Sequence, residues 1–211
     1  LLQLGIISIS FSNLGLSTGT GILFYVLCLI GSGINIPIYR RYIEEDTGAL
    51  PPYVERMPGF PAEISEQVIA INVGGALIPI MISLYLIAKK KFIGSAIIGI
   101  AIVSFFSYNV TDVTAEGITS TFPLWLIPPL VASVLSIFAS YKKPRNAAPL
   151  AYVTGTLGVL IGADFFHLPE MLRIHAPRLT EASIGGAAIF DMVFLTGIIA
   201  VLVDSFLIYK K

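Results

Sequence analysis

The sequence predicts an all-α membrane protein, a polytopic transmembrane helical bundle of six to seven spans that forms a single domain over residues 1–211. Hydrophobic residues make up 55% of the chain and charged residues only 12%, against about 25% charged residues in a soluble domain. Charge-free apolar runs recur along the chain. Lys and Arg number 13, as do Asp and Glu, so the basic surface that a nucleic-acid binder needs is lacking. A soluble enzyme, a disordered chain and a nucleic-acid partner are thereby excluded.

Each predicted helix follows from an apolar run, because about 20 apolar helical residues cross the hydrocarbon core of a bilayer. The runs predict helices near residues 1–14, 20–39, 67–88, 92–108, 121–140, 149–167 and 184–208. The glycine-rich residues 15–21 (GLSTGTG) separate the first two helices. Whether residues 1–14 form a complete span stays open.

Two connections between the helices are long. Residues 40–66 contain four prolines, so we expect a mostly irregular extramembrane loop there. Residues 167–183 place apolar side chains at helical spacing from Leu168 to Leu179. That spacing favours a short segment lying in the membrane interface.

The basic residues predict the orientation in the cell membrane. Residues 89–91, 142–145 and 210–211 supply eight cations and no acid on one side, while five arginines mixed with acidic residues lie on the other. Because cytoplasmic loops carry an excess of Lys and Arg, we expect a multi-pass protein whose C-terminus is cytoplasmic.

Two pairs of segments resemble each other and predict a partial internal repeat. Residues 29–37 (LIGSGINIP) pair with residues 160–169 (LIGADFFHLP), and residues 72–79 (NVGGALIP) with residues 183–190 (SIGGAAIF). An even number of spans separates the copies, so the repeat is parallel, about an axis along the membrane normal. Chance likeness of glycine-rich helix ends is the alternative. Gly185 and Gly186 also suit close helix packing, and Pro79 breaks a helix where the bundle offers partners to the freed carbonyls.

Two acidic residues, Asp164 and Asp191, fall inside predicted spans on consecutive helices and toward the same membrane side. An ionisable residue at the helix centre costs at least about 2.5 kcal/mol, which predicts a function. Two facing carboxyl groups would share a proton, so that one activates a water molecule while the other donates to the attacked carbonyl. The same pair also suits the passage of a proton or cation. The alternative is packing, in which each Asp bonds a backbone amide or Thr196.

Asn35 and Asn72 lie near the same predicted face and serve either as ligands along a substrate or ion pathway or as interhelical hydrogen-bonding groups. His167 and His175 are eight residues apart, which does not suit two metal ligands on one helical face. Neither a metal nor a cofactor is predicted.

Four motifs, GSGINIP, NVGGALIP, LIGADFFHLP and SIGGAAIFDMVFLTGI, resemble a prokaryotic family of polytopic membrane proteins of unknown function. This resemblance covers nearly the whole chain and implies no activity. Residues 191–201 (DMVFLTGIIAV) are also similar to the segment after the second catalytic aspartate of presenilin-like intramembrane aspartyl proteases. That similarity implies catalytic roles for Asp164 and Asp191. The chain departs from those proteases, since their Gly-x-Gly-Asp is AIFD here, their Tyr-Asp is Ala163-Asp164, and no Pro-Ala-Leu motif follows.

Three functions follow as hypotheses for this integral membrane protein. The first is an intramembrane di-aspartate peptidase with Asp164 and Asp191 as catalytic residues and a transmembrane peptide as substrate. The second is a small proton- or ion-coupled transporter or channel for a small solute, with Asn35, Asn72, Pro79, Gly185, Gly186 and Thr196 lining the pathway. The third is a structural or assembly subunit. Membrane lipid is the expected partner under all three.

Overall fold

The computed structural model describes residues 10–44, 64–114, 117–172, 181–186 and 192–209. The α-helices are α2 (Thr18–Gly31), α3 (Ile78–Lys90), α4 (Ile93–Val110), α5 (Ile127–Ala139), α6 (Ala147–Val159), α7 (Leu168–Met171) and α8 (Met192–Tyr209). Two π-helical segments, η1 (Val73–Leu77) and η4 (Leu160–Phe165), adjoin α3 and α6, and two 3₁₀ turns, η2 (Leu124–Leu126) and η3 (Pro144–Asn146), precede α5 and α6. The strands are β1 (Asn35–Glu44), β2 (Ile64–Asn72), β3 (Asp112–Thr114), β4 (Gly117–Thr119) and β5 (Glu181–Ile184).

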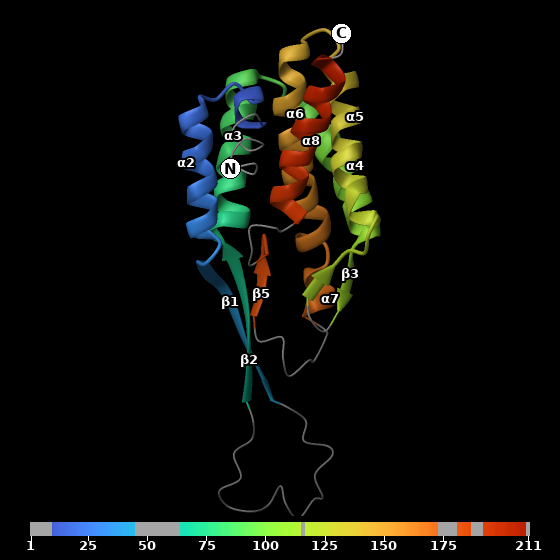
Figure 1. Cartoon of the computed structure of the whole chain (residues 1–211). Helices are drawn as coiled ribbons and strands as arrows, with labels where there is room; N and C mark the ends of the chain where they lie inside the picture. Colours follow the sequence, from blue (N-terminus) through green and yellow to red (C-terminus); the bar gives the residue numbers. More distant parts are fainter. Residues whose placement is uncertain (1–9, 45–63, 115–116, 173–180, 187–191, 210–211) are drawn as a thin grey trace, which may run out of the picture.

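The long helices lie side by side, with α2 and α3 at one side of the bundle and α4, α5, α6 and α8 grouped at the other (Figure 1). Within the described residues, three helices are long and apolar enough to cross a membrane, at Val73–Lys90, Ile93–Val110 and Pro144–Met171. Large apolar side chains on the outer faces are exposed, among them Leu23, Met81, Phe105 and Phe138. These features fit a membrane protein and confirm that the fold is mostly helical. The count of six to seven spans stays a prediction.

Helix α6 lies at the centre of the larger helix group, and all but one of its residues are buried. Its glycines make this possible because they let neighbouring helices approach closely. A Cβ atom at Gly158 would overlap Val103 of α4, one at Gly162 would overlap the Ser104 backbone, and one at Gly155 would contact Thr196 of α8. Helices α4 and α8 therefore pack directly on the backbone of α6.

A three-stranded sheet extends from one end of the bundle, which corrects the prediction of helices alone (Figure 1). Strands β1 and β2 pair antiparallel from Asn35↔Asn72 outward. Strands β2 and β5 pair in parallel from Val68↔Glu181 to Ile71↔Ile184. A separate hairpin joins β3 to β4.

The predictions of helices at residues 20–39 and 67–88 were wrong at the ends nearest the sheet, where the chain forms strands. Helix α2 ends at Gly31, and the chain then turns into β1; in the second case β2 runs to Asn72 before the helical segment begins. Pro37 cannot continue a helix, and branched Ile36 and Ile38 favour a strand. Hydropathy alone does not separate a buried strand from a buried helix in one unbroken apolar run.

The other predicted spans correspond to helices with shifted ends. The prediction at 92–108 matches α4, that at 121–140 matches η2 with α5, and that at 149–167 matches α6 with η4. The prediction at 184–208 corresponds to α8, which begins only at Met192. The predicted loop 40–66 in fact begins and ends in strands β1 and β2, while residues 1–9, 45–63 and 173–180 lie outside the described part of the chain.

The two copies of the predicted repeat differ in structure. Residues 29–37 pass from the end of α2 into strand β1, whereas residues 160–169 run from η4 through a turn at residues 166–167 into α7. The second pair agrees better, because each GGA motif directly follows a strand, β2 in one copy and β5 in the other. Those two strands run parallel. The two-fold relation between the copies remains a prediction.

Candidate functional site

Asp164 lies on η4, the π-helical continuation of α6 at the sheet end of the bundle. Its side chain is 8% exposed. Its Oδ2 atom accepts a hydrogen bond from the backbone N–H of Gly185 over 2.6 Å. Short π-helical segments inside helices occur frequently at functional sites. A buried carboxylate with a backbone donor therefore marks the place where α6 meets the end of β5.

The turn after β5 depends on two glycines in left-handed conformation. Gly185 has a φ angle of 87° and Gly186 one of 61°, a region that glycine enters without steric cost. This turn directs the Gly185 N–H toward Asp164. On its other side the turn lies against η1, because a Cβ atom at Gly75 would overlap the Gly185 carbonyl oxygen. The two GGA motifs thus contact each other.

Asn72 joins β2 to the helix that follows. The side chain is fully buried, and its Oδ1 atom accepts a hydrogen bond from Gly75 N over 2.7 Å, which caps η1. Its Nδ2 group donates to Ser32 O and to Asn35 Oδ1, both over 2.8 Å. One amide therefore satisfies donors and acceptors from the end of α2, from β1 and from η1.

The network continues to β5 through Asn35. Asn35 Oδ1 also accepts a hydrogen bond from Ser183 Oγ over 2.9 Å. Beside it, Gly74 packs against the end of α2, since a Cβ atom there would overlap Cys28 O and Ser32 N. All three strands of the sheet and the end of α2 thus meet at a polar, glycine-lined junction next to Asp164.

The structure brings together five of the residues predicted from sequence: Asn35, Asn72, Asp164, Gly185 and Gly186. Two others lie apart from this junction. Pro79 is buried near the start of α3, and Thr196 packs on Gly155 between α8 and α6. Asp191 lies outside the described residues.

Sequence reasoning missed Ser183, which joins the network only through Asn35, a partner distant in the chain. It expected the glycine pair 74–75 to allow close backbone contact, and Gly75 does meet Gly185. It also weighed His167 only as a metal ligand. His167 is buried, its Nδ1 lies 2.9 Å from the carbonyl oxygen of Ala163, and its ring stacks on Tyr108 with centroids 4.5 Å apart. A carbonyl can only accept, so Nδ1 carries a proton here. These contacts fix the segment directly after Asp164 against α4.

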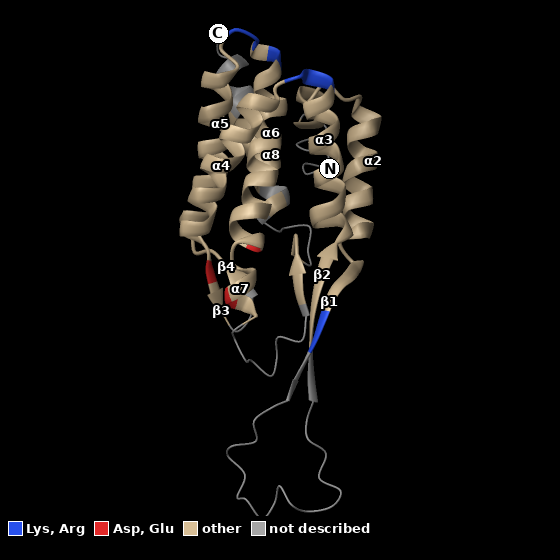
Figure 2. Cartoon of the chain, turned by 180° about the vertical axis from the view of Figure 1, so that it is seen from behind, with Lys and Arg blue, Asp and Glu red and all other residues tan. Residues whose placement is uncertain are grey.

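Charges separate toward the two ends of the molecule (Figure 2). The basic turns at residues 89–91 and 142–145 lie at the end farthest from the sheet. Strand β3 with Asp112, η4 with Asp164 and α7 with Glu170 belong to the sheet end. Arg40 and Arg41 lie on β1, also at the sheet end. The candidate site is therefore at the acidic end of the helices.

A family model with the description "Protein of unknown function (DUF1614)" matches residues 29–203. No curated protein and no solved structure matches the chain. The comparisons therefore agree with the resemblance to a membrane family of unknown function and add no support to the resemblance to presenilin-like proteases.

Proposed function

The chain belongs to the DUF1614 family, and from the surroundings of Asp164 we propose that this member is a membrane-embedded peptidase with Asp164 and Asp191 as its catalytic pair. The observation that carries the proposal is the hydrogen bond from Gly185 N to the buried Asp164 carboxylate. Gly185 begins the short stretch of chain that leads to Asp191 and α8. Asp191 therefore follows, only six residues later in the sequence, a residue that is hydrogen-bonded to Asp164.

The packing of α8 on α6 also supports this pairing. The two helices run in opposite directions (Figure 1) and touch where Thr196 meets Gly155. From that contact toward the sheet, α6 continues to Asp164, and α8 goes back to its first residue, Met192, which follows Asp191 in sequence. Asp164 and the first residue of α8 therefore belong to the same end of this helix pair.

The chemistry assigns different roles to the two carboxyl groups. Two carboxyl groups close together in a medium of low dielectric constant share one proton. A hydrogen bond from a backbone N–H stabilises the ionised form, so Asp164 is the base that takes a proton from water. Asp191 in its neutral form donates a proton to the carbonyl oxygen of the peptide as the water oxygen bonds to its carbon. Asp164 then passes its proton to the amide nitrogen, and a hydroxyl group of the tetrahedral intermediate returns a proton to Asp191. The C–N bond breaks as a result.

The test is cleavage of a model transmembrane peptide by the purified chain in lipid nanodiscs. Asp164→Asn and Asp191→Asn should each abolish cleavage while helicity and elution volume stay unchanged. Asp112→Asn is the matched control, because Asp112 is an exposed carboxylate at the same end of the molecule, and it should retain activity. Cleavage by either site variant, or no cleavage by the wild-type chain across a library of transmembrane peptides, would refute the proposal.

A transporter is the second candidate, and the π-helical segments favour it. Segment η1 follows Asn72 and segment η4 contains Asp164, and transporters bind coupling ions where helices are interrupted. In liposomes that enclose a pH-sensitive dye, this hypothesis expects proton flux that Asp164→Asn blocks, with no peptide cleaved. Absence of both activities in the wild-type chain would favour the structural or assembly subunit.

The orientation belongs to the same proposal. We place the basic turns at residues 89–91 and 142–145 in the cytoplasm, on the charge separation that Figure 2 shows and on the excess of Lys and Arg in cytoplasmic loops. The sheet and the candidate site then lie toward the outer face of the cell membrane, and the C-terminus is cytoplasmic.

A further inference from the structure

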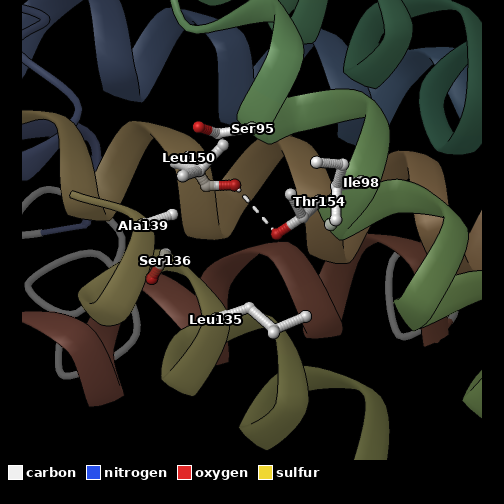
Figure 3. A pocket seen from close by; sticks show the side chains of 8 residues that line it. Ser95, Ile98, Leu135, Ser136, Ala139, Leu150 and Thr154 are labelled. Carbon is white, nitrogen blue, oxygen red and sulfur yellow. Dashed lines mark hydrogen bonds between the residues drawn. The ribbon is translucent and has the colours of Figure 1, made fainter.

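A groove lies between α4, α5 and α6 at the end of the bundle opposite the candidate site (Figure 3). Its cavity volume is about 110 Å³. Ile98 and Ala139 on its rim are exposed, whereas Leu150 and Thr154 on its floor are at most 2% exposed. The groove thus leads from the outer surface of the helices to the buried face of α6.

The lining of the groove suits a hydrocarbon chain. The Thr154 hydroxyl group donates to Leu150 O over 2.9 Å, and the Ser136 hydroxyl group donates to Ser133 O over 2.7 Å. Both of these hydroxyl protons are therefore used within the protein, and Figure 3 shows the bond that Thr154 makes. Ser95 adds a third hydroxyl group to the lining. The remaining wall is mostly apolar, with Ile98, Leu135 and Leu150 among its members. An apolar groove of this kind binds an alkyl chain with little loss of hydrogen bonds.

Each helix that lines the groove adjoins a basic turn. Helix α4 begins directly after residues 89–91, and the turn at residues 142–145 joins α5 to α6. Lys142, Lys143 and Arg145 are exposed. No Asp or Glu occurs in residues 67–111 or 117–163, which contain all three helices and both turns. The three helices that line the groove and the two turns that adjoin them therefore supply several cations and no acid.

We propose that the groove and the turn at residues 142–145 form a binding site for an anionic phospholipid. One acyl chain lies in the groove, and the phosphate group binds Lys142, Lys143 and Arg145. Basic pockets between membrane helices bind anionic head groups in this way. A second copy of this chain is a poorer occupant, because its own basic turns would meet like charges. The proposal does not depend on catalysis by Asp164.

The test is native mass spectrometry of the full chain in detergent, titrated with phosphatidylglycerol and with phosphatidylcholine of identical acyl chains. The wild-type chain should bind the anionic lipid at least about tenfold more tightly, since three cations contribute. The triple variant Lys142→Gln, Lys143→Gln, Arg145→Gln should lose this preference. The control is Arg40→Gln with Arg41→Gln, which removes exposed cations at the other end of the molecule and should keep it.

A further variant, Ala139→Leu, tests the groove independently of the head-group site. Ala139→Leu fills the rim without changing any charge, and Ala139 is exposed, so folding should be unaffected. This variant should bind phosphatidylglycerol at least about fivefold more weakly, since several buried methylene contacts are lost. Equal affinity of the wild-type chain for the two lipids would overturn the proposal. So would an unchanged preference in the triple variant, or wild-type affinity in Ala139→Leu.

Discussion

Replacement of Asn72 by Ala should destabilise the junction between the sheet and the helices more than any exposed substitution. The side chain is fully buried and makes three hydrogen bonds, with Ser32 O, Asn35 Oδ1 and Gly75 N. A hydrogen bond contributes about 1 kcal/mol net. Three lost bonds, of which the one from Gly75 N is the cap of η1, therefore predict a decrease of about 3 kcal/mol in the free energy of unfolding.

The assay is reversible unfolding by dodecyl sulphate in mixed micelles, followed by far-ultraviolet circular dichroism. Asn109→Ala is the control, because Asn109 is exposed on α4 and its side-chain amide donates to Phe105 O, within the same helix, over 2.7 Å. It should lose about 0.5 kcal/mol or less. Asn72→Asp should be at least as destabilising as Asn72→Ala, since the carboxylate keeps the acceptor for Gly75 N but places a buried acceptor oxygen against Ser32 O and Asn35 Oδ1. If Asn72→Ala lost no more than Asn109→Ala, the network would not be what joins the strands to the helices.

Two further predictions concern the glycine contact and the orientation. Gly75→Ala should destabilise the fold by about 1–3 kcal/mol through overpacking against Gly185. Gly94→Ala is the control, because a Cβ atom there meets open space on α4, and it should be neutral or stabilise by up to about 1 kcal/mol. Similar unfolding curves for both variants would contradict this prediction. In a Cys28→Ser background, a membrane-impermeant thiol reagent applied to whole cells should label a cysteine at position 50 and not one at position 90, and the reverse labelling would overturn the proposed orientation.

The sequence predicted the helices of the bundle better than the sheet. Helix α4 occupies an apolar run bounded by charged or polar turns, so composition alone places it. The sheet is different because β2 passes into η1 and α3 within one apolar run, and hydropathy does not change where the backbone conformation does. The alternation of Ile34, Ile36 and Ile38 was the available signal for β1, and the helix-length run around it concealed that signal.

The candidate site was predictable where a single residue is unusual and not where residues cooperate. Asp164 stands out because an acidic residue in an apolar helix is rare, and Asn72 stands out for a similar reason. Ser183 has no such mark, because hydroxyl groups are common in membrane helices. Its role depends on Asn35, a partner 148 positions away in the chain, and such a pairing follows only from the assembled sheet.

The parallel pairing of β2 with β5 has a consequence for the order in which the protein is made. Strand β2 is synthesised before α3, α4, α5 and α6, and β5 only after them. A nascent chain therefore inserts these helices while the edge of β2 still lacks β5, and such distant pairing forms slowly. The hydrogen bond to Asp164 comes from Gly185, so the surroundings of this carboxylate are completed only after all four of these helices have been made. Unfinished chains in the membrane consequently carry the helices without an assembled site.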